Sequence, residues 1–269
     1  MTDHYAVFGN PIAHSKSPLI HASFARQTGQ DLDYTALLAP LDGFVACVTA
    51  FRAGGGAGAN VTVPFKEQAH ALATVRSTRA EAAGAVNTLH FKGAEIYGDN
   101  TDGAGLVNDL TRNLGVDPKG RRILLMGAGG AARGVVQPLL ECRPAILFIA
   151  NRTPARAVEL ATRFRHAGPV HGGGYDALAG SAFDIVINAT AASLAGELPP
   201  LPEGIFADGA LAYDMMYGRD TPFLQLARQA GARTTDGLGM LVEQAAEAFF
   251  LWRGVRPDTA PVIALLRAG

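Results

Sequence analysis

A glycine-rich segment constrains the fold of this chain more than any other feature. The apolar run 122–126 predicts a strand, and a helical pattern begins a few residues later. Between them the chain reads Gly127-Ala128-Gly129-Gly130-Ala131-Ala132, which matches the pattern G-x-G-x-x-G/A. In that pattern the first glycine permits a tight turn, the second leaves room for a ligand, and the small third residue lets the helix approach the strand. A strand, a glycine turn and a helix in succession predict a βαβ unit of a parallel sheet.

Short apolar runs and longer helical patterns alternate along most of the chain. The predicted strands are residues 5–8, 33–38, 59–63, 123–126, 145–150, 184–187 and 211–214. The predicted helices are residues 20–28, 44–53, 103–113 and 238–251, with another that has Thr153 as its N-cap and Pro154 as its first residue. This order predicts an α/β protein with parallel sheets. The glycine runs 54–56 and 172–174 predict mobile loops.

The pattern divides into two lobes near Asp102. Residues 103–237 contain a turn at 115–120, a fresh strand and a complete α/β alternation, so they predict one lobe. The helices beyond residue 237 have no sheet of their own, and we expect them to pack on residues 1–102 to complete the other lobe. Two α/β lobes with a cleft between them are the predicted architecture, and ligands commonly bind in such clefts.

Composition excludes several classes of protein. Apolar residues make up 48% of the chain, charged residues 17%, and the net charge is −1, which favours a folded protein without the basic surface of a nucleic-acid or membrane binder. Neither a membrane-spanning run nor a secretion signal is visible, and Cys47 and Cys142 lack metal-type spacing. We therefore expect a cytoplasmic protein with no metal and no nucleic-acid or membrane partner.

The glycine turn and the end of the next strand predict a dinucleotide site. The amino end of a helix offers free N–H groups and a positive dipole to a phosphate. A carboxylate after the next strand would mark NAD, but this chain has Asn151-Arg152-Thr153 there, with Arg156 one turn later. Because a guanidinium suits a phosphate, NADP is favoured over NAD. The alternative is that both arginines are solvated surface charges.

Polar residues gather at turns of the N-terminal lobe. Ser15 and Ser17 could bind a carboxylate or could serve as an ordinary helix cap, and this segment alone leaves both readings open. Lys66 and Asp102 lie in separate turns, where such residues are often structural, but a lysine–carboxylate pair can act as an acid/base. His14 is a less favoured acid, since a histidine beside a serine loop is more often a structural hydrogen-bonder.

Taken together, these motifs resemble those of the shikimate dehydrogenase family. The resemblance rests on residues 7–18, 60–66, 84–88, 98–102, 127–131, 151–153 and 236–241, which occur in the family's order across the whole chain. It implies reduction of 3-dehydroshikimate to shikimate with NADPH, a step of chorismate and aromatic amino acid biosynthesis. It also implies that residues 1–102 with 238–269 form the substrate-binding catalytic domain and that residues 103–237 form a Rossmann-type NADP-binding domain.

The resemblance assigns individual roles. Lys66 would be the catalytic acid/base, paired with Asp102, and Ser15 and Ser17 would hold the substrate carboxylate. The remaining substrate-binding residues would be Thr62, Asn87, Asp102 and Gln244 at the ring hydroxyls, with Tyr217 closing on the substrate. The cofactor-binding residues would be Gly127, Ala128, Gly129, Gly130, Ala131, Asn151, Arg152, Thr153, Arg156, Met215 and Gly237.

One segment departs from the family pattern. After Thr190 the family often continues with serines and a glycine, whereas this chain has Ala191-Ala192-Ser193, so we expect a modest loss of cofactor affinity. Two other functions stay open, a quinate/shikimate dehydrogenase of broader specificity and a non-catalytic NADP-binding regulatory module. The sequence also leaves open whether the chain is a monomer or a homodimer.

Overall fold

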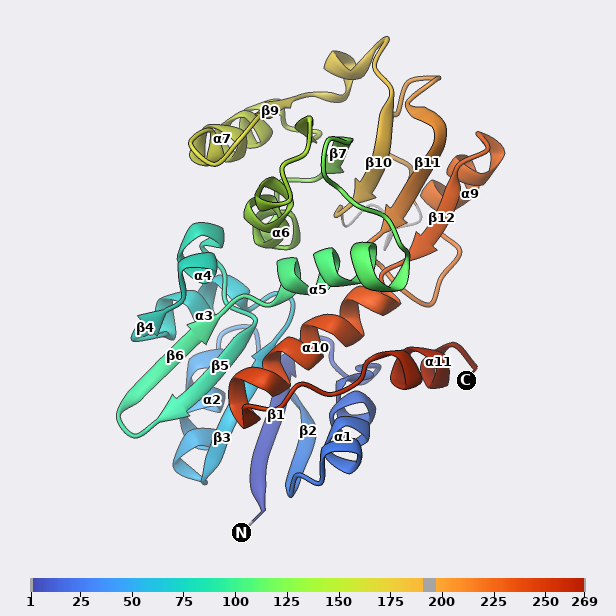
Figure 1. The fold of residues 1–269 in the computed structure, drawn as a ribbon. Coiled ribbons are helices and arrows are strands. Elements are labelled where there is room, and N and C mark those ends of the chain that lie inside the picture. The colour runs from blue at the N-terminus through green and yellow to red at the C-terminus, as the bar shows by residue number, and fades with distance from the viewer. Residues whose placement is uncertain (1, 191–196, 269) are drawn as a thin grey trace. The chain divides into compact units, whose positions relative to one another are not determined.

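The chain divides into two compact units. A computed structural model describes residues 2–190 and 197–268, so the departure at Ala191-Ala192-Ser193 lies outside the described residues. One unit comprises residues 1–105 and 241–269, and the other comprises residues 106–240. The chain passes from one unit to the other within α5 (Asp102–Asn108) and α10 (Leu238–Arg253) (Figure 1).

The first unit is built on a six-stranded mixed sheet with the order β2-β1-β3-β5-β6-β4. Its strands are β1 (Asp3–Gly9), β2 (Leu32–Leu38), β3 (Gly56–Val61), β4 (Val75–Arg76), β5 (Thr88–Lys92) and β6 (Glu95–Asp99). β1 pairs in parallel with β2 and β3, but β5 pairs antiparallel with both β3 and β6. The prediction of a purely parallel sheet is wrong here, because only Gly93 and Ala94 connect β5 to β6, and a parallel crossover needs a dozen residues or more.

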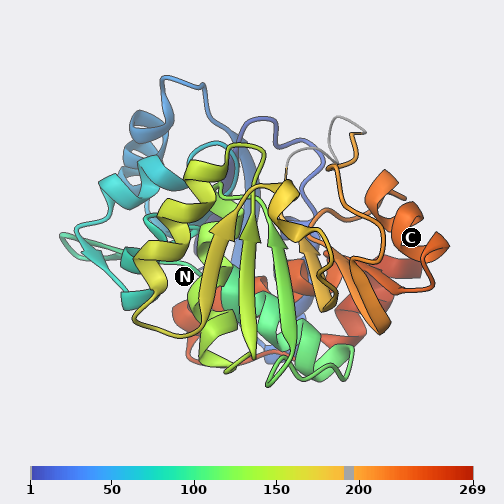
Figure 2. The ribbon, with the colours of Figure 1, turned by 90° about the horizontal axis from the view of Figure 1, so that it is seen from above.

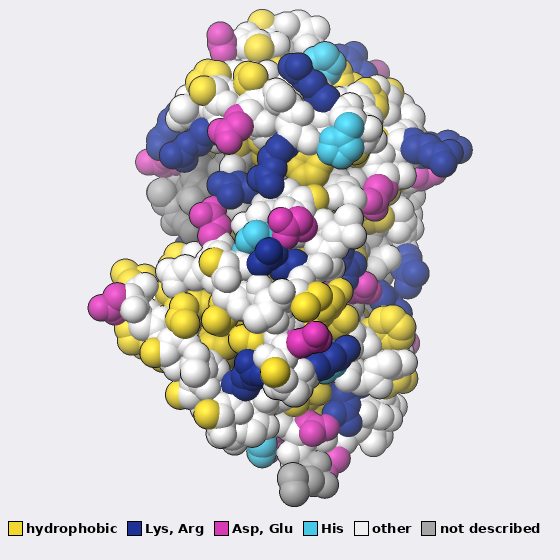
Figure 3. Space-filling view, turned by 90° about the vertical axis from the view of Figure 1, so that its left-hand side faces the viewer, with side chains coloured by type: hydrophobic (Ala, Val, Ile, Leu, Met, Phe, Trp, Pro, Cys, Tyr) yellow, Lys and Arg dark blue, Asp and Glu magenta, His cyan; other side chains and the backbone are white. Residues whose placement is uncertain are grey.

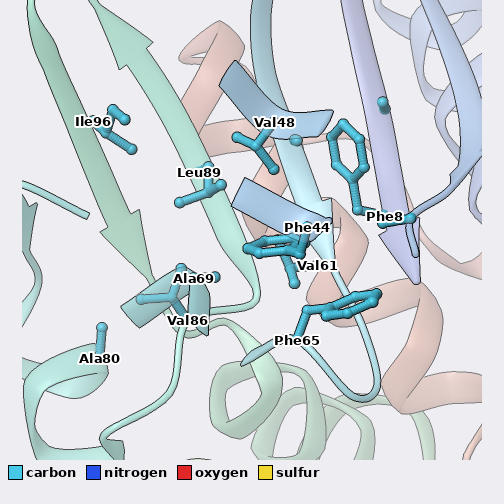
Figure 4. Close-up of a cluster of buried hydrophobic side chains, with 13 residues drawn as sticks. Phe8, Phe44, Val48, Val61, Phe65, Ala69, Ala80, Val86, Leu89 and Ile96 are labelled. Atoms are coloured by element: carbon cyan, nitrogen blue, oxygen red, sulfur yellow. The ribbon is translucent and has the colours of Figure 1, made fainter. Parts of the chain in front are cut away.

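An aromatic cluster fills the core between this sheet and the helices α2 (Phe44–Ala53), α3 (Lys66–Leu72) and α4 (Thr78–Ala83), whereas α1 (Ser17–Thr28) packs in a separate cluster. Phe44 stacks on Phe65 with ring centroids 4.8 Å apart, and Phe8 meets Phe44 edge-on at 6.2 Å. Figure 4 shows these rings converging with Val61 from three different elements. Because Phe65 is fully buried, it fixes the position of the next residue, Lys66, at the start of α3.

The C-terminal helices belong to the first unit's second hydrophobic cluster. Ile20 and Phe24 of α1 pack with Val242 and Phe249 of α10, and Val262 of α11 (Ala260–Ala268) completes the group. α10 therefore buries one face against α1, which holds its polar residues at fixed positions relative to the first sheet.

The second unit contains a fully parallel sheet with the order β12-β11-β10-β7-β8-β9, and Figure 2 shows these strands side by side. Its strands are β7 (Arg122–Met126), β8 (Ile146–Ala150), β9 (Val170–Gly173), β10 (Phe183–Asn188), β11 (Phe206–Asp214) and β12 (Arg233–Asp236). The helices that follow them include α6 (Gly130–Glu141), α7 (Pro154–Phe164) and α9 (Pro222–Gln229). Counted along the chain, the order is 3-2-1-4-5-6, which is the dinucleotide-binding arrangement.

The predicted mobile loops at the glycine runs are partly strand. Gly172 and Gly173 lie in β9, and a Cβ at Gly172 would come within 2.2 Å of the carbonyl oxygen of Ala157 in α7. Gly56 likewise begins β3, where a Cβ would lie 2.3 Å from the Phe51 ring. Both glycines therefore permit a helix to pack closely on a strand, and the prediction of mobile loops is wrong for these positions.

One helix prediction needs correction, and the start predicted for another helix, at Thr153 and Pro154, is confirmed. The single helix expected over residues 103–113 is α5 followed by one π-helical turn, η1 (Asp109–Asn113). Thr153 occupies the N-cap position of α7, but its side chain forms no capping hydrogen bond there.

The surface carries both signs of charge. On the face shown in Figure 3, basic and acidic side chains are interspersed, as the net charge of −1 would suggest. Among the described residues, no helix has the combination of length and apolar composition that crossing a bilayer requires.

Candidate active site

The first unit contains a nearly buried ion pair between Lys66 and Asp102. Lys66 Nζ lies 2.5 Å from Asp102 Oδ2, and the two side chains are only 17% and 8% exposed. Lys66 opens α3 and Asp102 opens α5, so each side chain projects from the first turn of a helix that follows a strand. At such burial the pair is weakly screened by solvent, and its geometry is more defined than that of a surface ion pair.

Asn87 holds the other oxygen of this carboxylate. Its Nδ2 donates to Asp102 Oδ1 at 2.9 Å, and also lies 3.0 Å from Thr101 Oγ1 and 3.3 Å from Gln244 Oε1. The amide cannot turn over freely, because its Oδ1 accepts from the backbone N–H of Thr101 at 2.9 Å and from the hydroxyl of Thr88 at 2.9 Å. Asp102 is thus held at one oxygen by Lys66 and at the other by Asn87.

Ser15 lies on the loop that joins β1 to α1, and Ser17 is the first residue of α1. The backbone N–H of Ser17 donates to Ser15 Oγ at 3.3 Å, so the Ser15 hydroxyl acts as acceptor and its O–H can still donate. The N-cap of α1 is Lys16, and its side chain forms no capping bond. The alternative of an ordinary serine cap therefore does not describe this helix, and the binding of a carboxylate by the two serines stays a prediction.

Thr62 lies at the end of the adjacent strand. It follows β3, and its backbone N–H donates to the carbonyl of Phe8 in β1 at 2.9 Å. A Cβ at Gly9 would lie 2.5 Å from Thr62 Cγ2, so the glycine makes room for this side chain. Within the first unit the structure joins Lys66, Asp102, Asn87 and Gln244 in one network, and it places Thr62 at the same edge of the sheet as the serine loop.

Thr101 is a component of this network to which sequence reasoning gave no role. It is fully buried, and its hydroxyl lies 3.3 Å from Gln244 Oε1 while its N–H fixes the Asn87 amide. The signal was present in the segment Gly98-Asp99-Asn100-Thr101-Asp102, but a buried threonine beside an aspartate looks like an ordinary turn residue. His14, the other candidate acid, is exposed on its loop.

In the second unit, the glycine turn after β7 has room beside Gly129 and Gly130, as far as the described residues extend. Gly127 has φ +110°, and a Cβ there would lie 3.0 Å from the carbonyl oxygen of Ala189, so its own surroundings require glycine. At Gly129 and Gly130, by contrast, a Cβ would meet no atom within 4 Å among the described residues. The space is free for a diphosphate, and the first-turn N–H groups of α6 can face it.

The residues after β8 fit an additional phosphate. Asn151 Nδ2 donates to the carbonyl of Thr153 at 3.0 Å, which shapes the turn into α7. Arg152 and Arg156 are exposed, and neither forms an ion pair with a carboxylate in the part of the chain that the structure describes. Their guanidinium groups are therefore available for the 2′-phosphate that distinguishes NADP from NAD.

Met215 and Gly237 follow the two neighbouring strands β11 and β12. A Cβ at Gly237 would lie 2.4 Å from the carbonyl oxygen of Met215, so close packing of the two segments explains this glycine. The buried Asp214 accepts from Thr221 Oγ1 at 2.7 Å and from the N–H of Met216 at 3.0 Å, which fixes the chain around Met215. Tyr217 lies in the same segment and is half-buried.

All the predicted cofactor residues thus follow the carboxyl ends of strands in the second sheet. Because parallel strands end at one edge, this edge brings together the segments after β7, β8, β11 and β12. In open α/β sheets this is where ligands bind. Among the described residues, no group of three or more His, Cys, Asp or Glu side chains is arranged to hold a metal.

Comparison with protein families gives three matches along the chain. Residues 7–89 match a family described as the shikimate dehydrogenase substrate binding domain, and residues 109–195 match one described as shikimate / quinate 5-dehydrogenase. Residues 237–267 match the shikimate 5′-dehydrogenase C-terminal domain.

Individual relatives extend over the full chain. A shikimate dehydrogenase (NADP(+)) of Nitrosospira multiformis is 65% identical, and the match covers 100% of this chain and 98% of that protein. The crystal structure of an Ael1 enzyme from Pseudomonas putida is 52% identical with a TM-score of 0.94, and 98% of each chain is covered. Shikimate 5-dehydrogenase from Thermus thermophilus, solved with NADP(H) and shikimate, is 33% identical with a TM-score of 0.88 and 99% coverage of each chain.

Proposed function

Because this chain belongs to the shikimate dehydrogenase family, we propose that it catalyses the reversible reduction of 3-dehydroshikimate to shikimate, with NADP(H) as cofactor. It is an oxidoreductase with the two-sheet α/β fold of that family. A non-catalytic regulatory module is therefore set aside. The observation that best supports this specific reaction is the ion pair of Lys66 and Asp102. Its Nζ and Oδ2 atoms lie 2.5 Å apart within a network of hydrogen-bonding side chains.

Each of the two units would bind one of the two ligands. The first unit would bind the substrate, with Ser15 and Ser17 donating to its carboxylate and Thr62, Asn87, Asp102 and Gln244 meeting its hydroxyls. NADP would bind along the strand ends of the second unit, with its diphosphate at Gly129 and Gly130 and its 2′-phosphate at Arg152 and Arg156. Tyr217, which belongs to the second unit, would be a further substrate-binding residue.

The first unit's residues supply the proton of the reaction. When bound, NADPH supplies a hydride to the ketone carbon of the substrate. Negative charge then develops on the ketone oxygen, and the ammonium of Lys66 donates the proton that completes the new hydroxyl. In the oxidative direction neutral Lys66 accepts that proton.

Asp102 would direct Lys66. One of its oxygens accepts from Nζ at 2.5 Å, while Asn87 holds the other at 2.9 Å, so the carboxylate has a fixed orientation. A bound ammonium with a fixed direction loses little freedom when the substrate arrives, which is the advantage of a preorganised site. The same carboxylate could accept a hydrogen bond from a neighbouring substrate hydroxyl.

The first experiment follows the absorbance of NADPH formed from NADP⁺ with shikimate, and separately with quinate. Turnover of shikimate supports the proposal, while comparable turnover of quinate would instead indicate a dehydrogenase of broader specificity. Failure to oxidise shikimate would overturn the assigned reaction.

Substitution of Lys66 tests the acid/base role. Lys66→Ala should lower kcat by about 10²–10⁴-fold, the usual contribution of general acid–base catalysis, with nearly unchanged shikimate binding. Lys119→Ala removes an exposed lysine of the second unit and serves as the matched control. Thermal unfolding of both variants checks that the fold survives. A kcat for Lys66→Ala equal to that of the wild type would remove Lys66 from the chemistry.

A further inference from the structure

Arg79 of α4 forms two parallel hydrogen bonds with Asp99 at the end of β6. Its Nε lies 2.7 Å from Asp99 Oδ1 and its Nη2 lies 2.6 Å from Asp99 Oδ2. The Asp99 side chain is only 4% exposed and also accepts from Ser77 Oγ at 2.5 Å. Such a bidentate pair fixes direction as well as distance.

The same guanidinium reaches a second element. Nη1 of Arg79 lies 3.1 Å from Glu247 Oε1 on α10, which is 168 residues further along the chain. The other oxygen of Glu247 accepts from Arg256 Nη1 at 2.6 Å. Arg79 therefore ties α10 to the carboxyl end of β6 through one rigid, planar group.

Each end of this link leads directly to the site. Asp99 accepts from the backbone N–H of Asn100 at 2.7 Å, and Thr101 and Asp102 follow. On α10, Gln244 precedes Glu247 by three residues, so the two side chains lie on the same face of the helix.

The contacts that Gln244 itself makes in the network are long. Its Oε1 lies 3.3 Å from Asn87 Nδ2 and 3.3 Å from Thr101 Oγ1, beyond the usual range for such bonds. Its Nε2 donates to the carbonyl of Leu241 on the same helix at 2.9 Å, so the Gln244 amide is fixed to α10 and only weakly to the other elements. Its position therefore depends on the placement of α10, which packs on α1 and is tied by Arg79 to the end of β6, three residues before Asp102.

From this geometry we propose that Arg79 and Glu247 are positioning residues. They hold α10 so that the side chain of Gln244 lies at the distance from Asp102 that is needed to bind a ring carboxylate bearing hydroxyl groups. The inference rests on the proposed function, in which Gln244 meets a ring hydroxyl. Neither residue touches substrate. They fix the position of α10 relative to the end of β6.

Charge supports this assignment. Burial raises the pKa of Asp99, but the hydrogen bonds and positive charge of Arg79 outweigh it and hold that pKa below its ordinary value. Asp99 is therefore ionised at neutral pH, so the bidentate pair with Arg79 persists under assay conditions. The outer partners, Arg79 and Glu247, are 29% and 19% exposed, so solvent partly screens this pair and its contribution to stability is modest.

A double-mutant cycle tests the inference. The variants are Glu247→Ala, Gln244→Ala and the double substitution, and the quantity measured is the Kd for shikimate by calorimetry. Glu247→Ala should raise this Kd about three- to tenfold, the effect of one weakened hydrogen bond. In the Gln244→Ala background the same change should alter Kd less than twofold, because the group being positioned is gone.

Two further variants separate positioning from general destabilisation. Glu81→Ala removes a carboxylate that pairs with Arg76, on the same helix as Arg79, and should leave Kd unchanged. Arg79→Lys keeps the charge but loses the planar fork, and its Kd should fall between those of the wild type and Glu247→Ala.

The outcomes distinguish the two proposals. Wild-type oxidation of shikimate tests the proposed function, whereas the cycle in Kd tests the positioning. Equal effects of Glu247→Ala in both backgrounds would overturn the inference, as would an unchanged Kd in the wild-type background.

Discussion

His21 offers a quantitative test of the first unit's core. It lies on α1 with no exposed surface, and its ring stacks on Tyr34 at 4.1 Å with an interplanar angle of 4°. Phe24, Phe249 and Trp252 surround it. Neither ring nitrogen has a hydrogen-bond partner of good geometry among the described residues. An imidazolium in these surroundings would be poorly stabilised, so burial lowers the pKa of His21 to about 3.

The size of the effect follows from linkage. In the unfolded chain His21 accepts a proton near pH 6.5, whereas in the folded protein it does so only near pH 3. Between these values the unfolded state binds more protons, so the free energy of unfolding falls as pH is lowered, by about 1.4 kcal/mol per pH unit. From pH 7 to pH 5 this single group should remove about 2 kcal/mol of stability, with the loss ending near pH 3.

The assay is urea unfolding of the wild type and His21→Phe at pH 7 and pH 5. Phenylalanine keeps a ring against Tyr34 but cannot titrate. Its larger size can shift the absolute stability, so only the difference between the two pH values is compared. His166→Phe, at an exposed position, supplies the correction for removing a histidine in general.

We expect the wild type to lose about 2 kcal/mol more than His21→Phe over this interval, as the linkage relation requires. If both proteins lose the same amount, His21 takes up its proton in the folded state, and the description of a dry aromatic environment is wrong.

Two other substitutions test the second unit. The double substitution Arg152→Ala and Arg156→Ala should raise KM for NADP⁺ about 10–100-fold, the range for losing charge-assisted hydrogen bonds, with little change in KM for NAD⁺. Arg163→Ala, at an exposed position of α7, is the control. Equal increases in KM for both cofactors would contradict the phosphate role. Gly172→Ala should lower the free energy of unfolding by about 1–3 kcal/mol, because the new Cβ would lie 2.2 Å from the Ala157 carbonyl oxygen. Wild-type stability of Gly172→Ala in urea would mean that α7 and β9 are not closely packed.

The site could be anticipated where its chemistry is encoded in a short stretch of chain. The strand, glycine turn and helix around Gly127, and the arginines after the next strand, are local patterns, and the structure has each on the expected element. Lys66 and Asp102 stood out as a lysine–carboxylate pair able to act as an acid/base, the resemblance assigned their roles, and the structure places their charged groups 2.5 Å apart. The second sheet is parallel as predicted because consecutive strands that lie side by side in it are joined by connections longer than the roughly dozen residues that a crossover needs.

Other features depended on contacts between distant segments. The antiparallel pairing of β5 with β6 is local, across the two-residue turn at Gly93, but the pairing of β5 with β3 joins segments that are not neighbours in the chain. The glycines at 56 and 172 look like loop residues until the helices that pack on them are known.

By itself the sequence determined the order of elements, the glycine turn and the chemical groups at the strand ends, because backbone preferences and side-chain periodicity act over a few residues. Only the tertiary structure decided that Arg79 meets Glu247 and that Asn87 meets Gln244, pairs separated by 168 and 157 positions. Contacts of that kind depend on how helices pack against a sheet. The local pattern around each residue does not specify which distant residue it will meet, because many partners are compatible with the same pattern.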